Sequence, residues 1–350
     1  MFTHKLFRPP LVLSLRAFVF AIFGLIHLSL LTGCASTPNP DDNIKLLTIG
    51  NSFTAISLSY LHRFAADDGK SLTLFSAAPG GTTLEAHAKA AKAYAVNPDD
   101  PAGRMYRQNQ QSFSLVEALK SQHWNYITIQ ESLGAAGHKD ASTESLQTLV
   151  DLIRVHAPQA KVLLFEPWSA REQTSPVPDG RTSSQISYES IHAETLRLAA
   201  QFNLTVLPVG TAFQNARNTP LWQVKNPDPN FDYTNPAVGS LPDQSGSLIV
   251  GWYWNHNTPR KMVIDNIHAN PAGCYLAGAV IYEAISGSDI RKNSLSVNDV
   301  TSSRAKNLRL IAHTTLAESH SVASAPPAPA STDSTPAAST ATPSPMPTTR

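Results

Sequence analysis

Two short stretches, far apart in the chain, contain residue types that suit nucleophilic catalysis. Ser52 lies in the string GNSFT (50–54), and Asp265 and His268 lie in DNIH (265–268). A serine hydroxyl becomes a nucleophile when a base takes its proton, and histidine is the natural base near neutral pH. A carboxylate that accepts a hydrogen bond from the ring orients the histidine and stabilises its protonated form. We therefore predict a catalytic triad of Ser52, His268 and Asp265.

Each of these strings also has a simpler interpretation. A serine between a strand and a helix can do no more than cap the helix. An Asp-x-x-His string can belong to an ordinary surface loop. Either string alone is weak evidence for a triad. The order in which both strings occur along the chain, together with two further strings, is more specific evidence.

The two further strings could stabilise the negative charge that forms when a carbonyl is attacked. PGGT (79–82) contains glycines, which let a backbone N–H approach a substrate closely. QES (130–132) begins with an amide side chain. We predict that the oxyanion is held by the backbone amides of Ser52 and of one of the two glycines, Gly80 or Gly81, and by the side chain of Gln130. A plain turn is the competing interpretation of the glycines.

The hydrophobic pattern places these strings beside the elements of a parallel sheet. Short apolar runs predict strands at 44–49, 72–76, 124–129, 162–165 and 204–209. Helical patterns occur at 57–66, 83–95, 115–122, 143–155, 184–202 and 272–285. The alternation of strands and helices predicts an α/β fold with three layers, α/β/α. Ligands bind beyond the carboxyl ends of such strands, where Ser52, Gly81 and Gln130 occur.

The stretch at 218–262 interrupts this alternation. It is rich in Pro, Asn, Asp and Gly, and it also contains the aromatic residues Trp222, Phe231, Tyr233, Trp252 and Trp254. Loops of this length without regular structure are usually functional or disordered. Because the aromatic residues argue against disorder, we expect an insertion that packs near the site.

The N-terminal end resembles the export signal of a bacterial lipoprotein. Two basic residues precede an apolar run at 11–33, which leads into the string LTGC (31–34). We predict a signal peptide at 1–33, lipid attachment to Cys34, and a tether at 34–43 that holds the protein at a membrane of the cell envelope. Ala35, after the cysteine, favours the outer membrane on its periplasmic side. An ordinary signal peptide, or an anchor helix that happens to contain a cysteine, is the alternative.

The C-terminal end has a different composition. Residues 318–350 are largely Ala, Pro, Ser and Thr, and such a segment cannot bury enough apolar surface to fold. We predict that this tail is disordered and that residues 44–317 form one domain. The formal net charge is +1, and no basic patch with interleaved aromatic residues occurs, which argues against a nucleic-acid partner.

The remaining reactive residue types favour no metal and no cofactor. His87 and His138 lie in polar contexts, are expected to be exposed, and have no carboxylate at the spacing of a metal site. His256 could line the pocket, but a loop contact is the simpler interpretation. The string EPW (166–168) could also line the pocket, and a structural turn is an equally simple interpretation of it. Cys274 lies in an apolar helical pattern and is expected to be a small buried residue.

The four strings in this order resemble the SGNH (GDSL-like) hydrolase superfamily. More closely, IGNSFT (49–54), GGTTLEAH (80–87) and QES (130–132) are similar to a bacterial branch of that superfamily known mainly as a domain of unknown function. The resemblance covers about 45–287 and implies a flavodoxin-like parallel sheet of five strands. It also implies that Ser52 is the nucleophile, Gly81 an oxyanion donor, and Asp265 and His268 the orienting acid and general base.

The sequence departs from the superfamily at one position. The typical pattern has Gly-x-Asn-Asp after the third strand, and its Asn donates to the oxyanion. Gln130 is the nearest substitute here. A related Gln-Gly-Glu-Ser string occurs at this place in sialate O-acetylesterase-like members.

The resemblance implies a serine esterase that needs no cofactor and acts on a small-molecule or glycan ester. An O-acyl or O-acetyl carbohydrate is the first choice of substrate, and a lipid or simple carboxylic ester is the next. Fold and triad do not fix a substrate. The alternative, from a different functional class, is a catalytically weak or inactive envelope lipoprotein that binds glycan.

Overall fold

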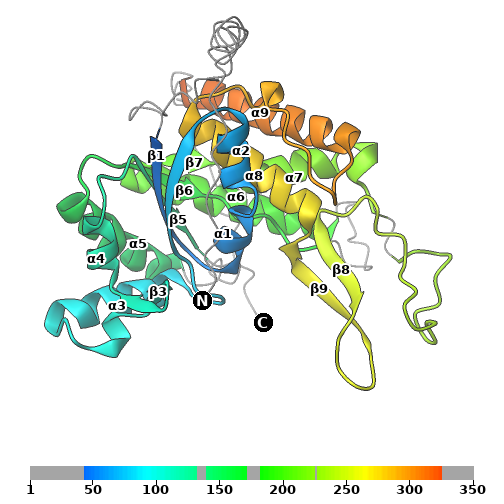
Figure 1. The fold of residues 1–350 in the computed structure, drawn as a ribbon, viewed down its shortest axis with the longest axis horizontal. Helices are drawn as coiled ribbons and strands as arrows, with labels where there is room; N and C mark the ends of the chain where they lie inside the picture. Colours follow the sequence, from blue (N-terminus) through cyan, green and yellow to red (C-terminus); the bar gives the residue numbers. More distant parts are fainter. Residues whose placement is uncertain (1–42, 132–138, 172–181, 225–226, 325–350) are drawn as a thin grey trace, which may run out of the picture.

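A parallel sheet of five strands forms the centre of the molecule (Figure 1). The computed structural model describes residues 43–131, 139–171, 182–224 and 227–324. The strands of this sheet are β1 (Asn43–Ile49), β2 (Ser71–Ala77), β5 (Tyr126–Gln130), β6 (Lys161–Phe165) and β7 (Thr205–Leu207). Their order across the sheet is β2-β1-β5-β6-β7, which is the flavodoxin-like order 2-1-3-4-5. The predicted fold class and the five predicted strands are confirmed.

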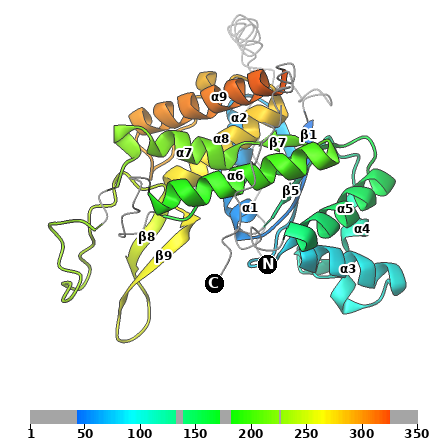
Figure 2. The same cartoon turned by 180° about the vertical axis from the view of Figure 1, so that it is seen from behind.

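Helices cover both faces of the sheet, as Figures 1 and 2 show from opposite sides. One layer contains α1 (Ser52–Ser57), α2 (Leu61–Asp67), α7 (Val209–Arg217), α8 (Pro271–Ser286) and α9 (Ser302–Ser324). The other contains α3 (Leu84–Val96), α4 (Leu115–Lys120), α5 (Lys139–His156) and α6 (Ser183–Phe202). The sheet separates two hydrophobic cores, one on each face. Successive side chains of β1 point to opposite faces, so Leu46 packs in the first core and Leu47 in the second.

The helix predicted at 57–66 is divided into two. The side chain of Asn51 caps α1, so this helix begins at Ser52 and ends at Ser57, and α2 begins at Leu61. The nucleophile candidate is therefore the first residue of a helix, directly after the strand. The helix predicted at 272–285 is α8, which begins one residue earlier, since Asn270 caps it and Pro271 is its first residue.

The expectation of a long insertion without regular structure up to residue 262 was wrong in its second half. Strands β8 (Ile249–Trp254) and β9 (Met262–Ala269) form an antiparallel hairpin that projects from the body in Figure 1. Asp265 and His268 lie on β9, not on a loop before the helix. The β-branched and aromatic residues of both strands favour this structure, but Gly251 and the polar turn obscured it.

Several elements were not predicted. They are α7, α9, the short hairpin of β3 (Tyr106–Gln108) and β4 (Gln111–Phe113), and the 3₁₀ turns η2 (Pro101–Gly103), η4 (Pro220–Trp222) and η5 (Ile290–Lys292). α9 ends at Ser324, beyond the boundary predicted at 317. Cys274 is buried, as expected, and burial raises the pKa of its thiol to about 11. Within the described residues, none of the helices has the length and apolar character needed to cross a bilayer.

Candidate active site

The turn between β1 and α1 presents Ser52 at the carboxyl end of the sheet. Asn51 fixes this turn, because its side-chain oxygen accepts a hydrogen bond from the Phe53 amide at 3.0 Å. The same side chain donates to the carbonyl of Thr82 at 3.2 Å. Asn51 therefore connects the serine turn with the glycine turn that follows β2. Ser52 itself is only half-buried, which leaves its hydroxyl open to a substrate.

Ser52, His268 and Asp265 form a continuous hydrogen-bonded chain. The hydroxyl of Ser52 lies 2.9 Å from His268 Nε2, and His268 Nδ1 lies 2.8 Å from Asp265 Oδ2. The aspartate can only accept, so the ring carries its proton on Nδ1 and its Nε2 is free to accept from the serine. Both distances are those of a general base bonded to its nucleophile and to its orienting acid. The structure thus brings together the three residues predicted as a triad.

The local backbone of β9 keeps the carboxylate of Asp265 ionised and in place. Asp265 Oδ1 accepts hydrogen bonds from the amides of Ile267 at 3.0 Å and His268 at 2.9 Å. Partial burial alone would raise the pKa of Asp265, but these bonds and the His268 ring outweigh it, and the pKa lies below the ordinary value. The carboxylate is therefore favoured in its charged form, which could stabilise an imidazolium at His268.

The segment after β6 supports the hairpin strand that carries the triad. The indole of Trp168, which is fully buried, donates to the carbonyl of Ile267 at 2.8 Å. Its ring packs against Phe53, next to the nucleophile, with ring centroids 4.5 Å apart. The amide of Arg171 donates to the carbonyl of Asn266 at 2.7 Å. The serine turn and the histidine strand thus share one support, which fixes their separation.

Two backbone amides remain available for an oxyanion. Among the described residues, no acceptor bonds to the amide of Ser52 or to that of Gly81. Gly81 has a φ of 72°, which is the left-handed region that favours glycine, and space around its α-carbon is open. Residues at the ends of β1 and β2 pair directly, Ile49 with Ala77, so the two turns that follow lie side by side. This arrangement agrees with the predicted roles of Ser52 and Gly81.

Gln130 does not occupy the position predicted for an oxyanion donor. Its side chain is completely buried, and its Oε1 accepts from the Asn51 amide at 3.1 Å and from the Thr54 hydroxyl at 3.0 Å. Its Nε2 donates to the carbonyl of Glu131. The amide is therefore held by protein groups behind the serine turn. Gln130 supports this turn from β5, and in this structure it does not reach the substrate side.

His87 was expected to be exposed, and this was wrong. Its ring is completely buried beneath the serine turn, with Nε2 2.8 Å from the carbonyl of Gly50 and Nδ1 2.7 Å from the hydroxyl of Tyr106. Because a carbonyl only accepts, Nε2 carries the proton and Tyr106 donates to Nδ1. Burial lowers the pKa of His87 to about 4. His87 follows Leu84 by three residues on α3, and this helical spacing could have revealed its inward direction.

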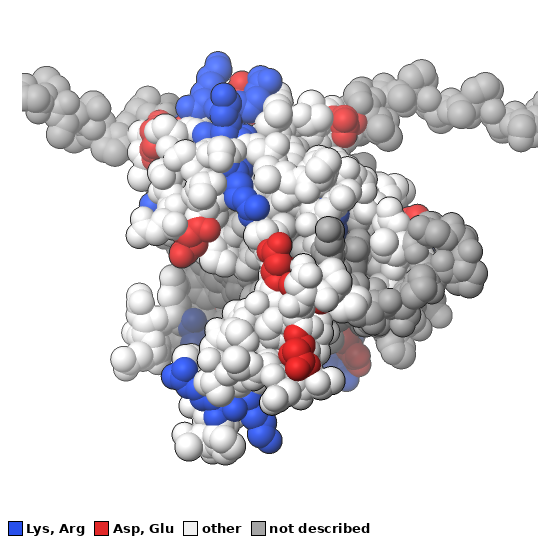
Figure 3. All heavy atoms as spheres, turned by 90° about the vertical axis from the view of Figure 1, so that its right-hand side faces the viewer, with Lys and Arg blue, Asp and Glu red and all other residues white. Residues whose placement is uncertain are grey.

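Two other residues singled out in the sequence, His256 and Glu166, have no hydrogen bond to the triad among the described residues. His256 is exposed in the turn of the β8–β9 hairpin, at the end away from His268. Figure 3 views the molecule from the side of the hairpin, and basic side chains gather at the lower end of the molecule in this view. Arg260 and Lys261, in the turn of the hairpin, are exposed. Glu166 is buried and bonds to His192. His138 lies outside the described residues.

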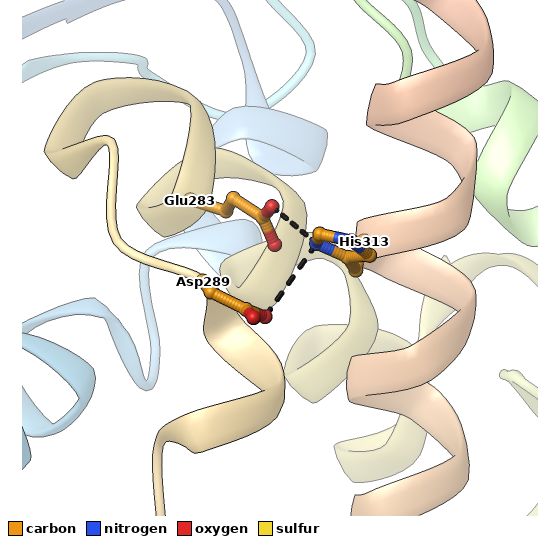
Figure 4. Close-up of side chains that lie close together, drawn as sticks. All are labelled: Glu283, Asp289 and His313. Atoms are coloured by element: carbon orange, nitrogen blue, oxygen red, sulfur yellow. Dashed lines mark hydrogen bonds and ion pairs between the residues drawn. The ribbon is translucent and has the colours of Figure 1, made fainter.

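Within the described part of the chain, one group of side chains has the composition of a metal site (Figure 4). His313 Nδ1 of α9 lies 2.7 Å from Glu283 and 3.5 Å from Asp289. However, Asp289 also accepts two hydrogen bonds of 2.8 Å from the guanidinium of Arg291. The guanidinium of Arg291 thus already balances the charge of Asp289. The bond between Glu283 and His313 joins α8 to α9.

The comparison with known families covers the first part of the domain. Residues 45–232 match the family model described as a domain of unknown function, DUF4886. The chain belongs to the DUF4886 family. The matched residues of this DUF4886 protein include Ser52, Gly81 and Gln130, whereas Asp265 and His268 lie beyond them. The assignment of the base therefore depends on the observed hydrogen bonds.

One solved structure of the same family shows the same fold, and two others are more distantly similar. A DUF4886 family protein from Bacteroides uniformis is 21% identical, with a TM-score of 0.57 over 79% of this chain and 95% of that one. A putative SGNH hydrolase from Slackia heliotrinireducens is 18% identical, with a TM-score of 0.41 over 69% of this chain and 98% of that one. A putative GDSL-like lipase from Parabacteroides merdae is 10% identical, with a TM-score of 0.39 over 70% and 95%. No match was found among curated proteins.

Proposed function

We propose that this DUF4886 protein is a serine esterase of the SGNH type. The observation that carries the proposal is the unbroken chain of hydrogen bonds from Ser52 Oγ through the ring of His268 to Asp265. A structural serine and histidine would not need an open hydroxyl, an ionised acid and a fixed tautomer together. The two unpaired amides at Ser52 and Gly81 add a place for the charge on the carbonyl oxygen.

These groups account for both halves of ester hydrolysis. His268 Nε2 takes the proton of Ser52 as Oγ bonds to the carbonyl carbon, and the carbonyl electron pair moves to the oxygen that the two amides hold. His268 then gives this proton to the leaving alcohol as the ester bond breaks, which leaves an acyl group on Ser52. Water repeats the sequence, releases the carboxylic acid and restores the serine.

We propose further that the substrate is an O-acylated carbohydrate of the cell envelope. Aromatic rings of the insertion support this choice: Tyr233 lies 4.9 Å from Phe231 and 5.6 Å from Trp252, measured between ring centroids. Trp252 belongs to β8, the partner of the strand that carries Asp265. Trp252 pairs with Ile264, the neighbour of Asp265 along β9, and these rings provide apolar surface of the kind that packs against sugar rings.

The triad is tested by the kinetics of single and double variants on an aryl acetate ester. Because Ser52 and His268 act as one unit, S52A, H268A and the double variant should fall to a similar residual rate, about 10⁴-fold or more below the wild type. D265A should lose less, since His268 remains present but poorly oriented. Circular dichroism checks that all four variants fold.

Labelling by a serine-reactive phosphonate separates the esterase from a glycan-binding lipoprotein. The wild type should react, and S52A should not. A wild-type protein that resists the phosphonate and hydrolyses no ester across a broad panel would be a binding module. Activity that persists in S52A would keep the enzyme and refute this triad.

A further inference from the structure

A second cavity, separate from the triad, lies at the free edge of the sheet. β7 ends the strand order, and a cavity of about 640 Å³ lies along it, lined by residues of β7, α6, the start of α7 and the C-terminal half of α9. Figure 2 shows α6 in front of the sheet, with α7 and α9 beside it. The volume is within the range of small-molecule sites, which are typically concave and mostly apolar with a few polar groups.

The walls of this cavity are largely apolar. Leu196 of α6, Leu204, Val206 of β7 and Pro208 line it. Leu196 is 47% exposed, although it lies in a concave part of the surface. Apolar side chains that converge on an open cavity lower their contact with water when an apolar molecule enters. The walls therefore fit the apolar body of a ligand.

One end of the cavity has a prearranged polar group. His192 and Thr211 line this end, and behind them lies Glu166, which is completely buried. Glu166 Oε1 is 2.5 Å from His192 Nδ1, and Oε2 accepts from the amide and the hydroxyl of Thr211, both at 2.7 Å. The protein thus satisfies both carboxylate oxygens and holds the histidine ring in a single orientation.

This arrangement leaves one nitrogen of the His192 ring for a ligand. The hydrogen bond to the Glu166 carboxylate raises the pKa of His192, although burial opposes this. With Nδ1 bonded to Glu166, the second ring nitrogen is Nε2, and it has no partner among the described residues. A buried acid paired with a histidine seldom improves stability over apolar packing, so such pairs are candidates for function. Glu318 of α9 is an acidic residue on the rim.

We propose that this cavity binds a small amphipathic carboxylate, with its apolar chain against Leu196 and Val206 and its carboxylate on His192 Nε2. The ligand is a fatty-acid-like molecule with a single anionic head. The site is independent of the esterase proposal, because no residue of the triad lines the cavity. The failure of either proposal leaves the other unaffected.

The apolar wall is tested by titrating the full chain with decanoate, below its micellar concentration, in a calorimeter. Decanoate should bind with one-to-one stoichiometry, and L196S should weaken it about tenfold. L310S is the matched control, because Leu310 of α9 is 49% exposed and does not line the cavity; it should bind as the wild type does. No binding by the wild type, or equal binding by L196S and L310S, would overturn the proposal.

The polar end is tested by comparing decanoate with decan-1-ol, which has the same chain and no charge. H192Q retains a donor for Glu166 but lacks the imidazole ring, whose protonated form Glu166 favours, so it should weaken decanoate about tenfold and leave decan-1-ol unchanged. A parallel loss for both probes would show that His192 acts only on the shape of the cavity, and a carboxylate site would be refuted. The melting temperature of each variant shows whether it is folded.

Discussion

At the scale of single residues, Gly80 and Gly81 differ in backbone conformation, and this difference can test which of the two glycines donates to the oxyanion. Both have open space where a side chain would extend, but only Gly81 has a positive φ, 72°. A side chain at Gly80 is therefore accommodated, whereas at Gly81 it strains the turn by about 1–2 kcal/mol. The strain acts on the segment that aims the Gly81 amide.

We expect G81A to lower kcat about tenfold or more with little change in KM, because an oxyanion donor acts mainly in the transition state. G80A serves as the control and should retain nearly full turnover. The measurement is steady-state hydrolysis of an aryl acetate ester. Equal turnover in the two variants would remove Gly81 from the oxyanion site, and a selective loss in G80A would transfer the role to Gly80.

The buried His87 makes the free energy of unfolding depend on pH. Its pKa is lowered to about 4 by burial, so between about pH 6.5 and 4 the unfolded chain binds a proton there and the folded protein does not. The stability that the neutral ring contributes is present above pH 6.5 and is lost as the pH falls towards 4. One such group changes the free energy of unfolding by about 1.4 kcal/mol per pH unit in this window.

H87Q should therefore lose less stability than the wild type between pH 7 and pH 4.5, even if it is less stable at pH 7. Urea denaturation at both pH values measures the difference. H62Q replaces an exposed histidine and should follow the wild type. If H87Q loses as much stability as the wild type between pH 7 and pH 4.5, then groups other than His87 cause the loss.

Residue types and their order were sufficient to predict the triad, but not the roles of the residues that support it. Ser52, Asp265 and His268 carry their chemistry in the side chain, so their types are informative. Gln130 and His87 act through burial and through the direction of their hydrogen bonds. Those properties depend on the packing of β5 and α3 behind the serine turn, which the strings alone do not specify.

At the scale of elements, the β8–β9 hairpin is held at two places by tryptophan indoles. Trp168 donates to Ile267 beside the histidine, and Trp254 of the hairpin donates to the carbonyl of Ser240, both at 2.8 Å. The first bond fixes the part of β9 that carries the triad. The second joins the hairpin to the insertion loop, nearer the tip.

W168F should lower kcat about tenfold with a smaller effect on KM, because it removes the hydrogen bond at Ile267 and leaves a ring to pack against Phe53. A shift of the base by a fraction of an ångström affects the rate more than binding. W254F removes a comparable bond away from the triad and should leave kcat nearly unchanged. Similar kinetics for both variants would show that Trp168 is only a core residue.

The elements that the sequence predicted best have strong periodicity. The buried strands β1 and β5 and the amphipathic α5 were predicted because their apolar residues follow the period of one element. The hairpin was missed because Gly251 has a φ of 69° at a register shift, which breaks the alternation of β8. α9 was missed because its apolar face is narrow and its last turns enter the Ala- and Ser-rich segment.

At the scale of the whole molecule, the location of the protein remains the prediction made from its N-terminal sequence. We expect C34A to abolish the incorporation of radioactive palmitate in the native host, because the thiol of Cys34 is the predicted site of the acyl chain. C274A is the control, since Cys274 is buried in α8 and should leave labelling unchanged. Palmitate incorporation that survives in C34A would place the lipid elsewhere or disprove the anchor.

The distance along the chain between Ser52 and His268 has a consequence for biosynthesis. The two side chains that exchange a proton are 216 positions apart, one after the first strand of the sheet and the other after most of the domain has been made. Contacts between such distant residues form late in folding, because the intervening chain must first be ordered. On a nascent polypeptide, Ser52 therefore lies without the histidine that would activate it, and we expect the proposed esterase activity only after the domain is complete.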